Sequence, residues 1–277
     1  GGMYHESIGP EGMAKDNAQA LKWYRKAAAQ GYAGAQSNLG VMYAEGEGVV
    51  QNHAKAAEWH RKAATQGNAG SQYALGCMYD DGKFAWCRMA KAPPHWHQLQ
   101  GLFWPGLKYL LTFLLYWYRM KKVLEWYRKA AAQGYAGAQY SLGGMYANGE
   151  GVAQDDAQAL EWTRKAAEQG NAEAQFNLGF MYREGLGVPK DYAQAAEWFR
   201  KAAKQRIAEA QFNLGIMYAD GEGVPQDYAQ AHMWFNLAAA QGGKDATERR
   251  DKVTKSMTPD QIAEAQKLSR EWAEQHQ

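Results

Sequence analysis

Potential metal ligands gather in one stretch of this sequence, between residues 80 and 122. Thiol and imidazole groups of the kind that bind zinc come from Cys87, His95 and His97. A zinc site needs four ligands in a recognisable spacing, and both the fourth ligand and the spacing are missing here. We therefore expect no metal site in this stretch and regard the three residues as incidental.

Tryptophans in the same stretch could stack on nucleic-acid bases; they are Trp86, Trp96, Trp104 and Trp117. Such a surface needs basic side chains that follow the phosphate backbone. The whole chain has 31 basic and 29 acidic residues, a net charge of +2, and no basic stripe accompanies the tryptophans. The composition therefore predicts packing roles for them and no nucleic-acid partner.

Residues for covalent or acid–base catalysis form no recognisable set. The remaining histidines lie in no pattern with a nucleophile and an acid; they are His5, His53, His60, His232 and His276. Gly-x-Gly recurs in the loops, but without a following Lys-Ser/Thr or a preceding strand it indicates a turn rather than a phosphate-binding loop. We expect no catalytic residue, no cofactor and no enzyme activity.

The elements that carry these residues repeat along the chain. Segments 58–79, 125–146, 161–182 and 197–218 are variants of one sequence that begins EWxRKAAxQ and ends LGxMY. Tryptophans mark the period at Trp23, Trp59, Trp126, Trp162, Trp198 and Trp234. Each step is 36 residues, except the step of 67 residues between Trp59 and Trp126. A fixed period of this length is typical of a repeat architecture.

Each repeat predicts two short helices. In 136–169, Gln139, Leu142 and Tyr146 lie at helical spacing, and Gly143 is small enough to admit a close neighbour. The loop GEGV ends the first helix, and Asp155 is a suitable N-cap for the second. Two short helices cannot bury their apolar faces alone, so the copies are expected to stack.

The repeat with its LGxMY sequence resembles the tetratricopeptide superfamily. The 36-residue period, the GxGV loop and the sequence AxxWxRKAAxQG resemble, more specifically, the Sel-1-like repeat family. The resemblance covers nearly the whole chain outside 82–122. It implies an all-α fold, a right-handed α-solenoid of 36-residue helix-turn-helix repeats. It also implies a scaffold that binds proteins or peptides, and no chemistry.

Two other functions stay open beside the scaffold. Relatives in the exported, cysteine-rich branch of this family are associated with penicillin binding, so one alternative is an exported bacterial protein with penicillin-binding or hydrolase activity. That branch carries paired cysteines that bridge the helices of each repeat, whereas here only Cys77 lies in a repeat helix. The other alternative is a frameshifted fragment without a function of its own.

Candidate partner-binding residues lie at variable positions in the first helix of each repeat. If tetratricopeptide geometry applies, the positions two before Leu-Gly, one after Leu-Gly and one after Met-Tyr face a concave groove. The large side chains at these positions are Tyr73, Tyr140, Phe176, Phe180, Arg183, Phe212 and Ile216. Aromatic residues are enriched at interface hot spots, which favours a role in binding a protein or peptide partner. Packing between adjacent repeats is the open alternative for the rings.

The array is expected to span 1–242 and to be followed by capping helices in 243–277. Thr258 as N-cap, Pro259 as the first helical residue and Gln261 as the end of a capping box predict the last helix. The chain starts inside a repeat, because its first residues align with LGVMYAEGEGVV, so we expect the natural N-terminus to lie upstream. No signal peptide is expected in this chain, and both a cytoplasmic and an exported location stay open.

The long step between Trp59 and Trp126 exceeds the period by 31 residues, so segment 83–122 is either an insertion or a whole repeat that is five residues short. The sequence AKAPPHWHQ at 90–98 resembles AKAAEWHRK at 54–62 and favours the shortened repeat. With suitably chosen synonymous codons, the flanks give repeat-like sequences in another reading frame. We therefore predict a degenerate repeat that is largely out of frame, which the coding DNA would test.

An apolar run, LKYLLTFLLYWY, occupies residues 107–118. Its uninterrupted part is about ten residues, whereas a bilayer span needs roughly twenty, so we expect no transmembrane span. From Leu107 to Gln133 there is no Pro or Gly, which predicts one long helix preceded by an irregular segment over 92–106. A helix that is apolar on nearly all sides leaves part of its surface exposed, so we expect self-association through 102–118.

Overall fold

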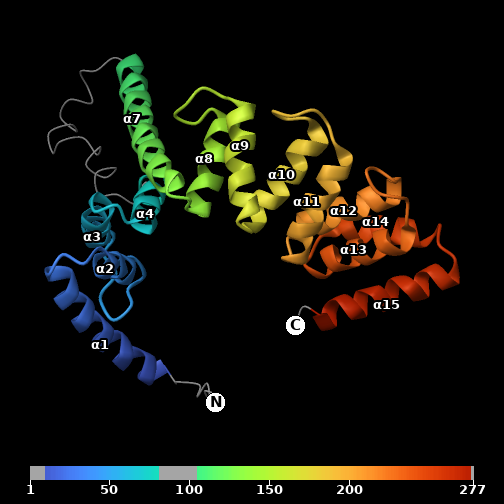
Figure 1. Cartoon of the computed structure of the whole chain (residues 1–277), viewed down its shortest axis with the longest axis horizontal. Helices are drawn as coiled ribbons and strands as arrows, with labels where there is room; N and C mark the ends of the chain where they lie inside the picture. The colour runs from blue at the N-terminus through green and yellow to red at the C-terminus, as the bar shows by residue number, and fades with distance from the viewer. Residues whose placement is uncertain (1–9, 81–104, 276–277) are drawn as a thin grey trace. The chain divides into compact units, whose positions relative to one another are not determined.

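A computed structural model describes residues 10–80 and 105–275, which form thirteen α-helices and no strand (Figure 1). The first helices of the repeats are α2 (Ala33–Glu45), α4 (Ala69–Asp80), α8 (Ala136–Asn148), α10 (Ala172–Glu184) and α12 (Ala208–Asp220). The second helices are α1 (Pro10–Ala29), α3 (His53–Thr65), α7 (Pro105–Ala132), α9 (Asp156–Glu168), α11 (Tyr192–Lys204) and α13 (Tyr228–Ala240). The chain closes with α14 (Lys244–Thr254) and α15 (Pro259–Gln275). The all-α prediction is confirmed.

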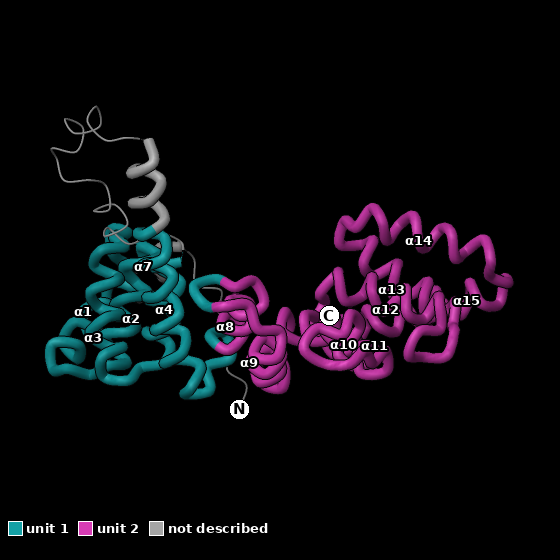
Figure 2. Tube along the Cα trace, turned by 90° about the horizontal axis from the view of Figure 1, so that it is seen from above, with its two compact units in different colours: residues 1–138, 150–152 teal, residues 139–149, 153–277 magenta. Residues whose placement is uncertain are grey.

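The helices belong to two compact units, which are coloured separately in Figure 2. Unit 1 comprises residues 1–138 and 150–152, and unit 2 comprises residues 139–149 and 153–277. Inside unit 1, α2 packs against α3, and α4 against α7. Inside unit 2, α10 packs against α11, and α12 against α13. Each pair is the expected two-helix repeat.

Local sequence signals fix the helix ends where they were predicted. The carboxylate of Asp155 accepts hydrogen bonds from the backbone N–H groups of Ala157 and Gln158, which have no partner inside the helix. Gly185 ends α10 with a φ of 76°, a left-handed conformation that only glycine adopts without strain. Thr258 and Gln261 bond reciprocally at the start of α15, which confirms the capping box.

The Leu-Gly pair of each first helix forms the centre of the core. The leucines, all at most 1% exposed, are Leu39, Leu75, Leu142, Leu178 and Leu214. The glycine that follows faces the residue after the tryptophan in the second helix. A Cβ on Gly179 would lie 2.8 Å from the ring of Phe199, and one on Gly143 would lie 2.6 Å from the Thr163 hydroxyl. The predicted close neighbour of Gly143 is therefore confirmed.

One buried and one exposed glutamine in each repeat form a hydrogen-bond ladder that was not predicted from the sequence. In one rung, the amide nitrogen of Gln175 on α10 donates to the Ala167 carbonyl at the end of α9, at 3.1 Å. The Gln175 oxygen accepts from Gln205, which follows α11, at 2.8 Å. The same pairing joins Gln36 to Gln66, Gln72 to Gln133, Gln139 to Gln169 and Gln211 to Gln241. In α2, α4, α10 and α12 the glutamine thus ties the first helix to the ends of two second helices.

Helix α7 combines a normal second helix with an extension at its N-terminus. The second glycine of each Gly-x-Gly loop lies over the first turn of the preceding second helix, as Gly187 lies over Asp156, the first residue of α9. In the same way Gly151 lies over Met120. Residues 120–132 therefore correspond to a regular 13-residue second helix, and residues 105–119 extend it. In Figure 1 the extension reaches past the end of α4.

The pairing of α4 with α7 favours the insertion over the shortened repeat. Helix α4 and residues 120–132 of α7 pack as the two helices of one repeat, which is the arrangement expected if the sequence between them was inserted. The single long helix predicted over 107–133 is confirmed, but it already begins at Pro105, where the sequence predicted irregular chain. Proline is well tolerated in the first turn, since its missing N–H has no partner there. The out-of-frame origin stays a prediction, and residues 81–104 lie outside the described part.

The helical period continues beyond the last recognisable repeat sequence. Helix α14 begins 36 residues after α12, at the position of a further first helix, and it packs against α13. Helix α15 also packs against α13. The capping function assigned to 243–277 stays a prediction.

Candidate partner-binding surface

The most exposed of the candidate residues lie on α10. Phe180 occupies the position after Leu-Gly and is 37% exposed, a large fraction for a phenylalanine. The guanidinium of Arg183 lies over its ring at 5.2 Å from the centroid. The cation and the ring attract each other, and together they present an apolar face with a charged edge.

Arg183 also connects α10 to α12. Its Nε donates to Glu184 at 2.8 Å, and its Nη1 donates to the side-chain oxygen of Asn213 on α12. These bonds hold the guanidinium in one orientation across neighbouring repeats of unit 2. A surface whose side chains are fixed before a partner arrives loses less conformational entropy on binding.

Ile216 lies further along the same row, in a cavity between α12, α13 and α14 of about 140 Å³. Tyr228, Phe235 and Val253 add apolar lining. The remaining lining residues are Ala219, Asp220, Arg249, Lys252 and Ser256. The cavity therefore combines apolar walls with two exposed basic side chains and one exposed acidic side chain.

The sequence analysis missed Arg249 and Lys252 because the repeat motif ends before α14. The helix spacing could have identified them: they lie 36 residues after Asn213 and Ile216. Helix α14 therefore contributes to the row although it carries no Leu-Gly sequence. We call Phe180, Arg183, Ile216, Arg249 and Lys252 the α10–α14 surface.

Three of the predicted binding residues instead pack between the two helices of a repeat. The ring of Phe176 lies 5.7 Å from that of Phe199, and the ring of Phe212 lies 5.7 Å from that of Phe235. Tyr73 lies 5.6 Å from Tyr127. All three are half-buried, and these ring contacts lie within one repeat rather than between adjacent repeats.

Tyr140, on α8, also packs against other helices of unit 2. Its side chain packs against a cluster formed by α9 and α10, which includes Leu160 and Leu178. It is half-buried. We leave these four rings out of the α10–α14 surface.

The lysines that follow the tryptophans interact within their own helices, whereas the arginine beside them, as in Arg164, donates to a tyrosine of the next helix. In α9, Lys165 bonds to Glu161 at 2.7 Å and lies 4.2 Å from the centroid of the Trp162 ring. The arrangement recurs in α7, where hydrogen bonds from Lys122 and Lys129 hold the pKa of Glu125 below its usual value. These lysines belong to a solvated helix face rather than to a basic ligand-binding ladder.

Other chemistry is sparse in the part of the chain that the structure describes. No group of three or more His, Cys, Asp or Glu side chains that could hold a metal occurs there. Its one cysteine, Cys77, is a free thiol that accepts a hydrogen bond from the Tyr127 hydroxyl at 3.6 Å, and burial raises the pKa of Tyr127. No described helix is both long and apolar enough to cross a membrane. Cys87, His95 and His97 lie outside the described residues.

One histidine is buried in the core of unit 1. His60 is 3% exposed and bonds through Nδ1 to the hydroxyl of Ser71 at 3.1 Å. Burial lowers its pKa to about 4. The corresponding positions in the α11–α12 repeat are Phe199 and Ala210, so His60 and Ser71 form a polar pair where another repeat is apolar.

We expect His60 to make unit 1 less stable in mild acid. An unfolded histidine takes up a proton near pH 6.5, whereas the folded one does so near pH 4, so the unfolded state binds more protons between these values. The free energy of unfolding should therefore have its full value above pH 6.5. It should fall by roughly 3 kcal/mol as the pH drops towards 4. Urea unfolding at several pH values measures this loss.

The matched variant carries His60→Phe and Ser71→Ala, the residues that the α11–α12 repeat already accommodates. It should remove most of the pH dependence in that range. The control His53→Gln alters a histidine at the surface-facing start of α3 and should leave the profile unchanged. An unaltered profile in the double variant would show that other groups cause the acid sensitivity.

The repeated helix pairs make the chain an α-helical repeat protein, a class of protein that typically serves as an interaction scaffold. The sequence profile of the Sel1 repeat matches residues 1–32, 33–68, 69–85, 124–135, 136–171, 172–206 and 208–243. These segments make up most of the sequence, so the chain belongs to the Sel1 repeat family. The profile is interrupted between residues 85 and 124, in the segment where the 36-residue period of the sequence is also broken.

One solved structure supports this assignment, and others are similar to the chain. A Sel1 repeat protein from Oxalobacter formigenes is 29% identical, with a TM-score of 0.68 over 95% of this chain and 92% of that one. A protective antigen of uropathogenic Escherichia coli, c5321, is 35% identical over 94% of this chain and 64% of that one, with a TM-score of 0.43. Cysteine-rich protein B of Helicobacter pylori is 29% identical over 46% of this chain and 95% of that one, with a TM-score of 0.36. No curated protein sequence matches the chain.

Proposed function

We propose that the chain is a scaffold that binds a protein or peptide partner through the α10–α14 surface. The observation that carries the proposal is Phe180, a phenylalanine that is exposed on a first helix and is flanked by an arginine held in place from α12. Sel1 repeat solenoids typically serve protein interactions, which supports this function. Aromatic residues and arginine are the residue types most enriched at interface hot spots.

The charges of the surface favour a partner with an acidic residue beside an apolar one. Arg249 and Lys252 place two positive charges around the cavity of Ile216, against the single carboxylate of Asp220. An apolar side chain of the partner fits the cavity wall, and a neighbouring carboxylate fits its basic rim. Because these charges are exposed, their contribution to binding should weaken as the salt concentration rises.

The test uses peptides selected from a random display library against the immobilised chain. Phe180→Ala and Ile216→Ala should each weaken the binding of a selected peptide by about 1–3 kcal/mol, because each removes a large apolar contact. Tyr192→Ala is the matched control, since Tyr192 is also an exposed aromatic residue of unit 2, 37% exposed, but lies on the second helix α11. Isothermal titration calorimetry measures all four proteins. Equal losses in the control and in the two variants would contradict the assignment of the surface.

We also propose that the chain self-associates through the extension of α7. Five consecutive large side chains there, 114–118, are each 45–59% exposed: Leu114, Leu115, Tyr116, Trp117 and Tyr118. Consecutive side chains point in different directions around a helix, so these five form an exposed apolar patch that surrounds the extension. Exposed apolar surface of this kind is unusual on a monomeric protein and marks an interaction surface. A second copy offers the same patch, and two such helices can cover each other.

A further inference from the structure

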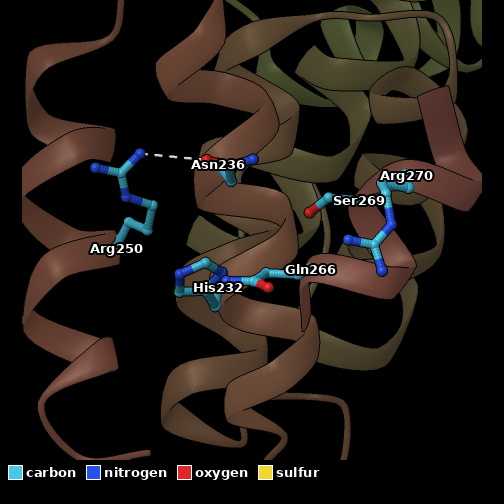
Figure 3. A pocket seen from close by; sticks show the side chains of 6 residues that line it. All are labelled: His232, Asn236, Arg250, Gln266, Ser269 and Arg270. Atoms are coloured by element: carbon cyan, nitrogen blue, oxygen red, sulfur yellow. Dashed lines mark hydrogen bonds between the residues drawn. The ribbon is translucent and has the colours of Figure 1, made fainter. Parts of the chain in front are cut away.

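The last three helices enclose a second cavity, which shares no residue with the α10–α14 surface. It has a volume of about 380 Å³ and is lined by His232, Asn236, Arg250, Gln266, Ser269 and Arg270. Figure 3 shows His232 and Asn236 on α13, with Arg250 of α14 on one side and the residues of α15 on the other. All six side chains are polar, three of them are basic and none is acidic.

Arg250 is fixed at one wall of this cavity. Its Nη1 donates to the side-chain oxygen of Asn236 at 3.2 Å, and its Nη2 donates to Asp251 at 2.8 Å. These bonds use only some of the five guanidinium hydrogens. Because the Asn236 oxygen is occupied by Arg250, the amide nitrogen of Asn236 is the group that remains to donate.

Arg270 brings a second guanidinium to the cavity. Among the described residues no carboxylate lies within ion-pair distance of Arg270; Glu264 and Glu271 of α15 lie 3.8 and 3.9 Å from Lys267. Gln266 lies one helical turn before Arg270, on the same face of α15. The guanidinium of Arg270 is therefore not held in an ion pair.

His232 lies between the two arginines and is left without a partner. Its Nδ1 is buried and has no hydrogen-bond partner among the described residues. Burial lowers the pKa of His232, and the neighbouring Arg250 lowers it further, against a smaller opposite effect of Asp251. The ring of His232 thus lies in surroundings that disfavour its positively charged form, and its Nδ1 lacks a hydrogen-bond partner among the described residues.

We infer that this cavity binds a small ligand through an oxyanion, a carboxylate or a phosphate group. Guanidinium groups match the paired oxygens of both anions, and Asn236 and Gln266 add neutral donors. The volume lies within the range of small-molecule sites, so the ligand carries the anion on a small organic body rather than being a bare ion alone. A bound anion supplies a carboxylate-like partner for Arg270, whereas Arg250 is already paired with Asp251.

The experiment titrates the whole chain with two probes, inorganic phosphate and citrate, at an ionic strength held constant with sodium chloride. Calorimetry follows binding, and the imidazole NMR signals of His232, assigned with His232→Asn, follow its protonation. We expect saturable binding of at least one probe and a rise in the pKa of His232, because the anion stabilises the charged ring. Binding of citrate alone identifies a carboxylate ligand, and binding of phosphate alone identifies a phosphate ligand.

Arg270→Gln should weaken the bound probe about tenfold or more, because it removes a charged hydrogen-bond donor from an exposed position without disturbing the core. Lys244→Gln is the matched control: it removes one positive charge from α14 at a residue that does not line the cavity. Circular dichroism confirms that both variants fold. The inference is overturned if neither probe changes the His232 signals more than chloride does, or if the two variants weaken binding equally.

Discussion

Replacement of Phe199 with alanine is expected to lower the free energy of unfolding of unit 2 by about 3–5 kcal/mol, the usual cost of removing a buried phenylalanine side chain. Phe199 is 0% exposed and belongs to the cluster that includes Leu214 and Met217. Its ring lies against Gly179 and 5.7 Å from the ring of Phe176. The glutamine ladder ties the C-terminal end of α11 to α10 and α12 and so limits how far the helices can close the space. The deletion therefore leaves a cavity.

The control for this variant is Phe180→Ala, which removes the same side chain from the exposed side of α10. It should cost no more than about 0.5–1 kcal/mol of stability, since much of the ring is already in water. Denaturant unfolding of both variants gives the comparison. Equal losses of stability in the two variants would contradict the description of α10, in which Phe176 faces α11 and Phe180 faces solvent.

The second large effect concerns the oligomeric state. The chain as it stands should give a mass in solution that is a multiple of 30.9 kDa, because the apolar patch on the α7 extension buries itself against a second copy. Leu115→Glu combined with Tyr118→Glu should give a monomer. The two residues are three apart and so lie on one face of the helix, where two buried carboxylates strongly oppose association. Light scattering after size-exclusion chromatography measures the mass.

Two further chains make this experiment specific. Val50→Glu changes an isolated exposed valine, 89% exposed in a loop, and should leave the oligomer intact. A chain in which the loop 149–155 replaces residues 82–119 restores the 36-residue step and should be a more stable monomer, because α4 already pairs with residues 120–132. A monomeric mass for the unaltered chain would disprove self-association and remove physical support for the out-of-frame hypothesis.

Most of the fold could be predicted from the sequence because its signals are local and repeated. Glycines that end a helix, Asp155 as an N-cap and the Thr258–Gln261 capping box act within a few residues of chain, so the sequence alone states them. The Leu-Gly pair predicts a close contact between the two helices in every repeat. Repetition of these signals at 36 residues also determined the family and the two-helix repeat.

Only the tertiary structure decided which aromatic residues face a partner and which face the core. Phe176 and Phe180 are four residues apart and lie on adjoining parts of one helix surface, so helical periodicity cannot separate them. The docking of α11 separates them, because Phe199 reaches Phe176 and leaves Phe180 in solvent.

The same holds for contacts between residues that are far apart in the chain. The pairing of α4 with α7 across the insertion, the glutamine ladder over 30 residues and the cavity between α13, α14 and α15 join elements that no local pattern relates. Helix ends are set by neighbouring residues, whereas burial and pockets are set by the helices that pack together. The sequence therefore determined the repeat and its helices, and packing determined the surfaces on which the chain can bind.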